Sequence, residues 1–423
     1  MDITSASPIP DIQAAILSEM FSRPRSKKID VQASPEFKKL YLSLLEDQRG
    51  QDAISTAAQN LAITQDVSSQ WKHWVEFETR RRLVLSAFMW DVQQATLFKQ
   101  SLCDPSMDPA ATGLYLPCPK QVWDCNSPDE WANMRNLAPQ ESSQLSDAVK
   151  VLASAGPQPQ PLGEFASALT LTSLMSIAIA IDQEDSDHVA ATASASGKRK
   201  DLESSYERWW HSYFNSSRGS NSTVTTRTPR DPGTLLMYHM ALLTLHTDIR
   251  DLLTVAGESF VFGQKRQKAD YLQAKRDLRS WANTPSAAAK AAWHAAKILR
   301  IALSATEKAS AMTLTTHWCM HIAGLVCWAY GYAHTVRPSL PLPQPPSPST
   351  GEAAKTAWPY LEATNTRSWE ELDTVEMRCR TTGLLIHVRT ALERSTRGEC
   401  QLLSEGAQVL RRLAERRATF CGF

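Results

Sequence analysis

The longest helical pattern in this chain runs from Val67 to Phe98 and constrains the fold more than any other feature. In its first half a glutamate twice precedes an arginine by four residues, as Glu76 with Arg80 and Glu78 with Arg82, the favourable order for exposed ion pairs on a helix. Its second half, from Leu83 to Trp90, is apolar and is expected to be buried. A long helix with an apolar half needs other elements to cover it, so the pattern predicts packed helices.

Apolar spacing and start and stop signals indicate further helices. Asp231 followed by Pro232 is a strong helix start, Gly257 is a stop, and the apolar stripe between them includes His239 and His246. Prolines favour an extended segment at Leu114–Pro119. The other predicted helices cover residues 11–21, 35–46, 141–153, 163–181, 206–214, 285–303, 314–332, 369–394 and 401–417.

No convincing strand ladder accompanies these patterns. We therefore expect an all-α protein, an irregular multi-helix bundle with Pro/Ser-rich flexible insertions. The predicted segments are a first helical part (1–181), flexible insertions around a short aromatic helix (182–230), a second helical part of the same domain (231–337), a Pro/Ser-rich linker (338–368) and C-terminal helices (369–423).

Charge and hydropathy argue against several classes of protein. The chain has 45 Lys and Arg and 44 Asp and Glu, a formal net charge of +1, so no overall field would draw it to nucleic-acid phosphates or anionic lipid. The most apolar stretches, 168–181 and 318–332, are shorter than the roughly 20 residues of a membrane helix, and Met1–Ser5 does not start a secretory signal. We expect no membrane association and no direct DNA contact through this chain.

Histidines and cysteines show no convincing metal or catalytic pattern. His317 and His321 are four residues apart, but the glutamate of the metalloprotease motif is missing between them. His239 and His246 stand roughly 10 Å apart along a helix, too far for easy joint ligation. The eight cysteines lack the close pairs of a zinc module and indicate reduced thiols. We therefore expect no cofactor, no metal and no catalytic residue.

Three segments of the chain contain motifs that indicate its relationship to known proteins. The first is the aromatic and charged motif from Trp71 to Asp91, the second is Leu116–Pro119 with Trp123 and Trp131, and the third runs from Tyr238–Met240 to Trp293–Ala296. Together they resemble the fungal-specific transcription factor domain, the regulatory region that follows the zinc module in many fungal regulators. The third segment is similar to the subgroup preceded by two-Cys two-His zinc fingers.

The resemblance implies an all-α fold, a nuclear location and a role in transcriptional control rather than enzymatic activity. Met1 falls where the family is already inside its domain, so we expect the zinc module and the domain start to be missing. The expected partners are proteins of the transcription machinery or a DNA-binding relative, in a homodimer or heterodimer, with the small-molecule effector unidentified. Control of a biosynthetic gene cluster is one role consistent with such a regulator.

The candidates for a family-motif core or regulatory pocket are Trp71, Trp74, Glu76, Arg80, Arg81, Asp91, His239 and His246. The tryptophans are most simply core side chains, and the arginines form a solvated helix face partnered by Glu76 and Glu78. Because a buried carboxylate needs a partner, we expect Asp91 to bind one of the arginines or one of the two histidines. The basic residues Lys198, Arg199 and Lys200 are a candidate nuclear import signal, with a plain solvated loop as the alternative.

The sequence leaves two alternative functions open. His239, His246, His317 and His321 motivate a metal- or small-molecule-dependent enzyme built inside a helical bundle. Exposed helices motivate a scaffold or competitor that dimerises with a full-length regulator and blocks it.

Overall fold

The computed structural model describes residues 3–22, 32–58, 66–104, 113–137, 143–154, 156, 162–187, 192–215, 230–258, 260–307, 314–334, 350–373, 381–396 and 400–419. Across these ranges the chain is helical apart from loops and one two-stranded hairpin, which confirms the predicted all-α class. The contacts divide into two compact units. The first comprises Met1–Met20, Gln32–Thr96 and Gln100–Pro229, and the second comprises Phe21–Val31, Leu97–Lys99 and Arg230–Phe423.

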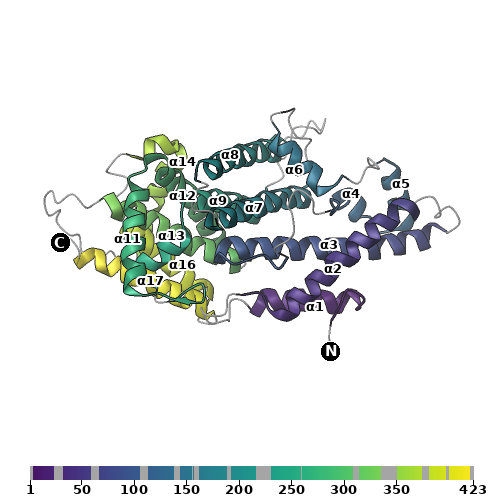
Figure 1. Ribbon diagram of the computed structural model, residues 1–423, viewed down its shortest axis with the longest axis horizontal. Helices are drawn as coiled ribbons and strands as arrows, with labels where there is room; N and C mark the ends of the chain where they lie inside the picture. Colours follow the sequence, from purple (N-terminus) through teal and green to yellow (C-terminus); the bar gives the residue numbers. More distant parts are fainter. Residues whose placement is uncertain are drawn as a thin grey trace. The chain divides into compact units, whose positions relative to one another are not determined.

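The first unit is built from the helices labelled α1 to α8 in Figure 1. The predicted long helix, α3, begins and ends where the pattern does, and Asp66 caps it by accepting from the Ser69 N–H at 2.9 Å. The bounds are α1 (Ile9–Ser22), α2 (Pro35–Ala58), α3 (Val67–Phe98), α4 (Lys120–Trp123), α5 (Pro128–Leu137), α6 (Leu145–Ala153), α7 (Glu164–Asp187) and α8 (Thr192–Asn215).

Helix α8 packs along α7 (Figure 1). Its second half contributes the buried aromatic side chains of Tyr206, Trp209 and Tyr213 to the core of this unit. The buried indole of Trp209 donates to the Ser167 carbonyl at 2.8 Å and stacks on Tyr213 with 4.8 Å between ring centroids. The predicted flexible insertion is therefore wrong for 182–187 and 192–205, which are helical, whereas the short aromatic helix predicted at 206–214 is confirmed as the second half of α8. Burial of the aromatic half stabilises a helix whose Ala/Ser start has no apolar period of its own.

Helix α7 contains a segment, Glu164–Glu184, of 21 residues that is long and apolar enough to span a membrane by length and composition. It is longer than the stretch 168–181 that the sequence indicates, because helical turns at both ends extend it. In its most apolar window 61% is buried, and Leu169, Thr170 and Leu174 are fully covered. These contacts are typical of a core helix.

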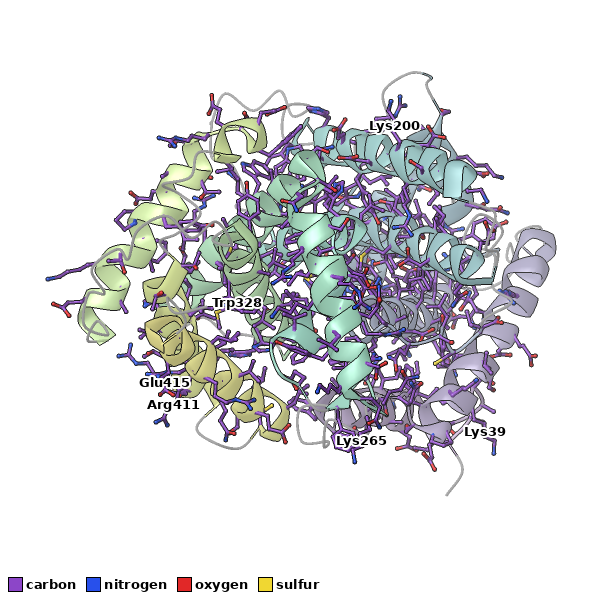
Figure 2. The ribbon with its side chains drawn as sticks, turned by 60° about the vertical axis from the view of Figure 1, so that its left-hand side comes forward. Lys39, Lys200, Lys265, Trp328, Arg411 and Glu415 are labelled. Atoms are coloured by element: carbon purple, nitrogen blue, oxygen red, sulfur yellow. The ribbon has the colours of Figure 1, made fainter. Side chains whose placement is uncertain are left out.

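The second unit packs its remaining helices around α12 and α13, which pack against each other. Figure 2 shows Trp328 of α13 among these helices, whereas the ion pair Arg411–Glu415, at 2.8 Å, lies on the outer face of α17. The bounds are α9 (Pro232–His246), α10 (Ile249–Val255), β1 (Phe260–Val261), β2 (Gln264–Lys265), α11 (Lys268–Ala282), α12 (Pro285–Glu307), α13 (Leu314–His334), α14 (Thr350–Thr366), the 3-10 helix η3 (Trp369–Asp373), α16 (Thr381–Thr396) and α17 (Gln401–Thr419).

The predicted helix from Pro232 to Gly257 is two helices, α9 and α10. The chain leaves the helix at Thr247, and Asp248 starts the next one by accepting from the Arg250 N–H at 2.7 Å. Asp is a good N-cap even where an apolar stripe continues past it, so a local cap outweighs the periodicity here. Gly257 ends α10 with a φ of +95°, as its position predicts.

The segments 338–368 and 369–394 also differ from their predictions. Residues 350–366 of the expected linker form α14, although Pro359 lies inside it and removes one helical hydrogen bond. Ala353, Ala357 and Leu361 are buried, and this packing offsets the proline. Beyond it η3 and α16 replace one predicted helix. Residues 188–191, 216–229, 335–349 and 374–380 lie outside the described residues.

Candidate functional site

Glu78 lies at the centre of the first segment singled out by the sequence, on the face of α3 that turns into the first unit. Its side chain is 1% exposed. It accepts from Arg82 Nε at 2.9 Å, from the Cys118 backbone N–H at 2.9 Å and from Arg81 Nη1 at 3.4 Å. A buried carboxylate is tolerated when charged donors surround it in this way. We call Glu78, Arg81 and Arg82 the Glu78 clamp.

The Glu78 clamp holds the extended segment around Cys118 by both of its backbone groups. While Glu78 accepts from the Cys118 N–H, Arg82 Nη2 donates to the Cys118 carbonyl at 3.1 Å. Upstream, the Leu116 N–H donates to the Ser143 carbonyl and the Leu145 N–H donates to the Leu114 carbonyl, at 3.0 and 2.8 Å. An ion pair thus supplies the hydrogen bonds that a neighbouring strand would supply. The segment is extended as predicted.

Tryptophans cover the outer end of this arrangement. Trp74 lies 5.4 Å from Trp131 and 6.3 Å from Trp123 between ring centroids, and Trp71 packs against the same cluster around Val122. The Arg82 guanidinium stands 4.2 Å over the Trp123 ring, a cation–π contact that also shields the ion pair from water. Trp71 and Trp74, the two tryptophans among the candidate site residues, therefore lie in one aromatic cluster beside the Glu78 clamp.

The expected solvated arginine face is only partly correct. Arg80 pairs with Glu76 at 3.4 Å on the surface and also donates to the Ser5 carbonyl at 2.6 Å. Arg81, by contrast, is buried with Glu78 and stacks over the Phe77 ring at 4.6 Å. The spacing of Trp71, Trp74, Glu78, Arg81 and Leu85 follows one helix face, and this stripe is the signal that could have identified the clamp.

Asp91 is buried, as expected, and one of its partners is a backbone amide, while the expected arginine or histidine partner stays a prediction. Its carboxylate accepts from the Cys103 backbone N–H at 3.0 and 3.2 Å. Burial, followed by the charge of Asp91, raises the pKa of Tyr41 well above its ordinary value. Asp91 thus ties the loop after α3 back to the helix, which is a structural role.

In the second unit, His239 of α9 meets His294 of α12, with 3.0 Å between their Nδ1 atoms. Both rings are buried, and burial lowers the pKa of His239 to about 3 and that of His294 well below its ordinary value. Lys297 and Arg300 of α12 lower the pKa of His239 further. Two neutral imidazoles form this bond when one Nδ1 carries the proton and the other accepts it.

Lys297 and Trp293 form the outer edge of this histidine pair. Lys297 Nζ stands 4.5 Å over the Trp293 ring and donates to the Asn365 carbonyl at 3.2 Å. Burial, followed by Arg300, lowers the pKa of Lys297 to about 8. Asn365 belongs to α14, so these contacts join α9, α12 and α14 at one place.

The remaining predicted positions do not build a metal site. His246 is half-buried and its carbonyl accepts from the Trp281 indole at 2.7 Å, while His317 and His321 are buried on α13. Within the described ranges, no three His, Cys, Asp or Glu side chains are grouped so that they could hold a metal ion. The Cys118 thiol, with a pKa raised to about 12 by burial, is protonated at neutral pH and is a poor nucleophile.

The candidate import signal lies on a helix rather than in a loop. Arg199 pairs with Asp182 at 2.9 Å and Lys198 with Glu184 at 2.5 Å, both across to α7. Lys200 is exposed on the same helix (Figure 2). Its role in import stays a prediction, as do the regulatory roles of the other candidates.

Comparison with known proteins identifies a family that matches the part of the chain containing these residues. Residues 12–211 match the family described as the fungal specific transcription factor domain, a stretch that contains the Glu78 clamp and the tryptophan cluster. The family is one of transcription factors and not of enzymes. Its members regulate transcription, which implies a nuclear role. This finding removes the support for a metal- or small-molecule-dependent enzyme.

Three curated relatives are fungal proteins. The chain is 26% identical over 63% of its length to the nicotinate catabolism cluster-specific transcription factor of Emericella nidulans. It is 24% identical over 95% to zinc finger protein klf1 of Schizosaccharomyces pombe, and 29% identical over 22% to transcription factor PfmaH of Pestalotiopsis fici. The matches span 32%, 51% and 10% of those proteins, so the chain corresponds to at most about half of each. No solved structure matches.

Proposed function

Because residues 12–211 form a fungal specific transcription factor domain, we propose that this chain is the regulatory part of a nuclear regulator of genes for small-molecule metabolism. The match to a cluster-specific transcription factor for nicotinate catabolism supports this class of target genes. Control of a biosynthetic gene cluster belongs to the same proposal.

In this proposal another segment makes the DNA contact, either elsewhere in the same polypeptide or in a DNA-binding partner. The formal net charge of +1 supports this arrangement, because a protein that binds DNA alone needs a basic surface to neutralise phosphates. The match to a zinc finger protein over 95% of this chain but 51% of that protein supports it as well.

The observation that carries the proposal is the overlap between the family match and the Glu78 clamp. A buried ion pair that holds a loop by its backbone is costly to assemble unless every donor is satisfied. The clamp fixes the largely buried segment Leu114–Cys118 and the tryptophan cluster, which together support α5, and we propose that the exposed face of α5 is where the domain contacts other proteins.

A tethered reporter tests the function. The chain is fused to an unrelated DNA-binding domain and directed to a reporter promoter in a fungal host. We expect transcription to differ from that with the DNA-binding domain alone, and Glu78→Gln to abolish the difference because the loop is released. Glu76→Gln is the matched control, since Glu76 is exposed on the same helix.

Equal reporter levels for the fusion and the DNA-binding domain alone, at equal nuclear abundance, would contradict the proposal. Equal effects of Glu78→Gln and Glu76→Gln would contradict the role given to the clamp but not the function itself. Transcript profiles from a strain without the gene then test the target class. Unchanged genes of small-molecule metabolism would overturn that part.

A further inference from the structure

Ser34, at the start of α2, is hydrogen-bonded to the carboxylate of Glu19 on α1 and so connects these two helices of the first unit. It precedes α2, where its hydroxyl accepts from the Phe37 N–H at 3.1 Å as an N-cap. The same hydroxyl donates to Glu19 Oε2 of α1 at 2.7 Å, and the Ser34 N–H donates to Glu19 Oε1 at 3.3 Å. Glu19 is only 6% exposed, so these two donors help to compensate a buried charge.

A phosphoryl group on Ser34 would act on the two helices in opposite directions. It would remove the hydroxyl proton that Glu19 accepts and place close to two negative charges against a buried carboxylate. At the same time it would remain favourable at the N-terminus of α2, where free N–H groups point toward an anion. The modification would therefore weaken the contact between Ser34 and Glu19 of α1, while the N-cap of α2 would stay intact.

The sequence around Ser34 is accessible to an enzyme. Ser34 is half-buried and lies outside helical structure, and it is followed by Pro35, which is exposed. Gln32 on one side and Glu36 on the other are exposed as well. A serine directly before a proline in an accessible, non-helical stretch is the substrate that proline-directed protein kinases require.

We propose that Ser34 is a phosphorylation site of a proline-directed kinase and that its modification releases α1 from α2. The kinase transfers the γ-phosphoryl group of ATP to Ser34 Oγ, so that an O–P bond forms, the bond to ADP breaks and the hydroxyl proton passes to the catalytic base of the kinase. The phosphoserine then repels Glu19. This inference goes beyond the proposed function and does not depend on which genes are controlled.

Another Ser-Pro pair in the described part of the chain provides a matched control. Ser127 precedes Pro128 and caps α5 by accepting from the Glu130 N–H at 3.2 Å. Its cap is local to that helix, and α1 takes no part in it. A negative charge at Ser127 therefore tests the effect of a modified helix start without the contact to Glu19.

The first experiment treats the full chain with ATP and a mitogen-activated protein kinase, maps phosphate by mass spectrometry and follows hydrogen exchange. We expect phosphate on Ser34 and roughly tenfold or greater acceleration of exchange in α1, because a charged hydrogen bond is lost. Exchange at the start of α2 should stay slow. The variant Ser34→Ala should show neither the phosphate nor the acceleration.

A second experiment needs no kinase. Ser34→Asp keeps an acceptor at the N-cap but faces Glu19 with a carboxylate, so exchange in α1 should accelerate while α2 stays protected. Glu19→Gln combined with Ser34→Asp should restore α1, because the amide donates to the new carboxylate. Ser127→Asp should leave α1 unchanged. Failure of the kinase to modify Ser34 while it modifies a Ser-Pro peptide, or unchanged α1 exchange in phosphorylated protein, would overturn the proposal.

Discussion

The carboxylate of Glu78 holds three donors from two parts of the chain, and this makes it the residue with the largest expected effect in the first unit. Arg82 and Arg81 come from its own helix, whereas the Cys118 N–H comes from a loop far along the chain. Removing one member of a buried ion pair leaves the others uncompensated. The neighbouring pair Glu76–Arg80 has an exposed glutamate and should contribute little.

Glu78→Gln should lower the free energy of unfolding of the first unit by about 3 kcal/mol, the usual cost of breaking a buried ion pair. Urea unfolding followed by tryptophan fluorescence measures it, because Trp74, Trp123 and Trp131 lie beside the clamp. The matched Glu76→Gln should cost under about 0.5 kcal/mol. Similar losses for the two variants would mean that Glu78 does not hold the loop.

The pair His239–His294 should make the second unit sensitive to acid. Unfolded histidine titrates near its ordinary pKa of 6.5, whereas folded His239 stays neutral to about pH 3. Between these values the unfolded state binds more protons, so stability falls as the pH falls. Each buried histidine contributes about 1.4 kcal/mol per pH unit in that window.

The slope of unfolding free energy against pH between 4 and 6.5 is therefore expected to be shallower in His294→Asn than in the natural chain. Asparagine keeps a polar atom near the Nδ1 position but does not titrate. His73→Asn, at an exposed position on α3, serves as the control and should leave the slope unchanged. Parallel slopes in all three proteins would show that the pair does not govern acid sensitivity.

At the scale of elements, close approach of helices depends on single glycines. Gly406 of α17 lies against His321 of α13, and a Cβ at this position would stand 3.1 Å from Cε1 and Nδ1 of a ring that is fully buried. An alanine normally stabilises a helix by about 1 kcal/mol relative to glycine. Here the covered ring has little room to move, so the steric cost should exceed that gain.

Gly406→Ala is expected to destabilise the second unit by about 1 kcal/mol net, the balance of overpacking and helix propensity. Thermal unfolding by circular dichroism measures it. Gly197→Ala, at an exposed position of α8 where a Cβ meets nothing within 4 Å, should instead stabilise its helix. A gain in both variants would mean that α17 can shift away from His321 without loss.

At the scale of the whole molecule, composition suggests segment boundaries at 181, 230 and 337, whereas the contacts, apart from the short segments Phe21–Val31 and Leu97–Lys99, place the boundary between residues 229 and 230. The predicted boundary near 230 coincides with the boundary between the two units, because a polar stretch ends there at the Asp231 cap. The predicted boundary at 181 has no counterpart in the structure, since Trp209 of α8 packs back onto α7. Local composition cannot reveal that a later aromatic face covers an earlier helix.

The sequence by itself determined the helical class, the full extent of α3, the extended segment at Cys118 and the resemblance that the family match at 12–211 confirms. These depend on periodicity, caps and prolines, which act over a few residues. Only the tertiary structure decided that Glu78 is buried while Glu76 is exposed, that Asp91 binds the Cys103 amide, and that His239 meets His294. Asp91 and Cys103, like His239 and His294, lie apart in the sequence, so local patterns do not show that they meet. Which of the two glutamates is buried depends on how the whole unit packs.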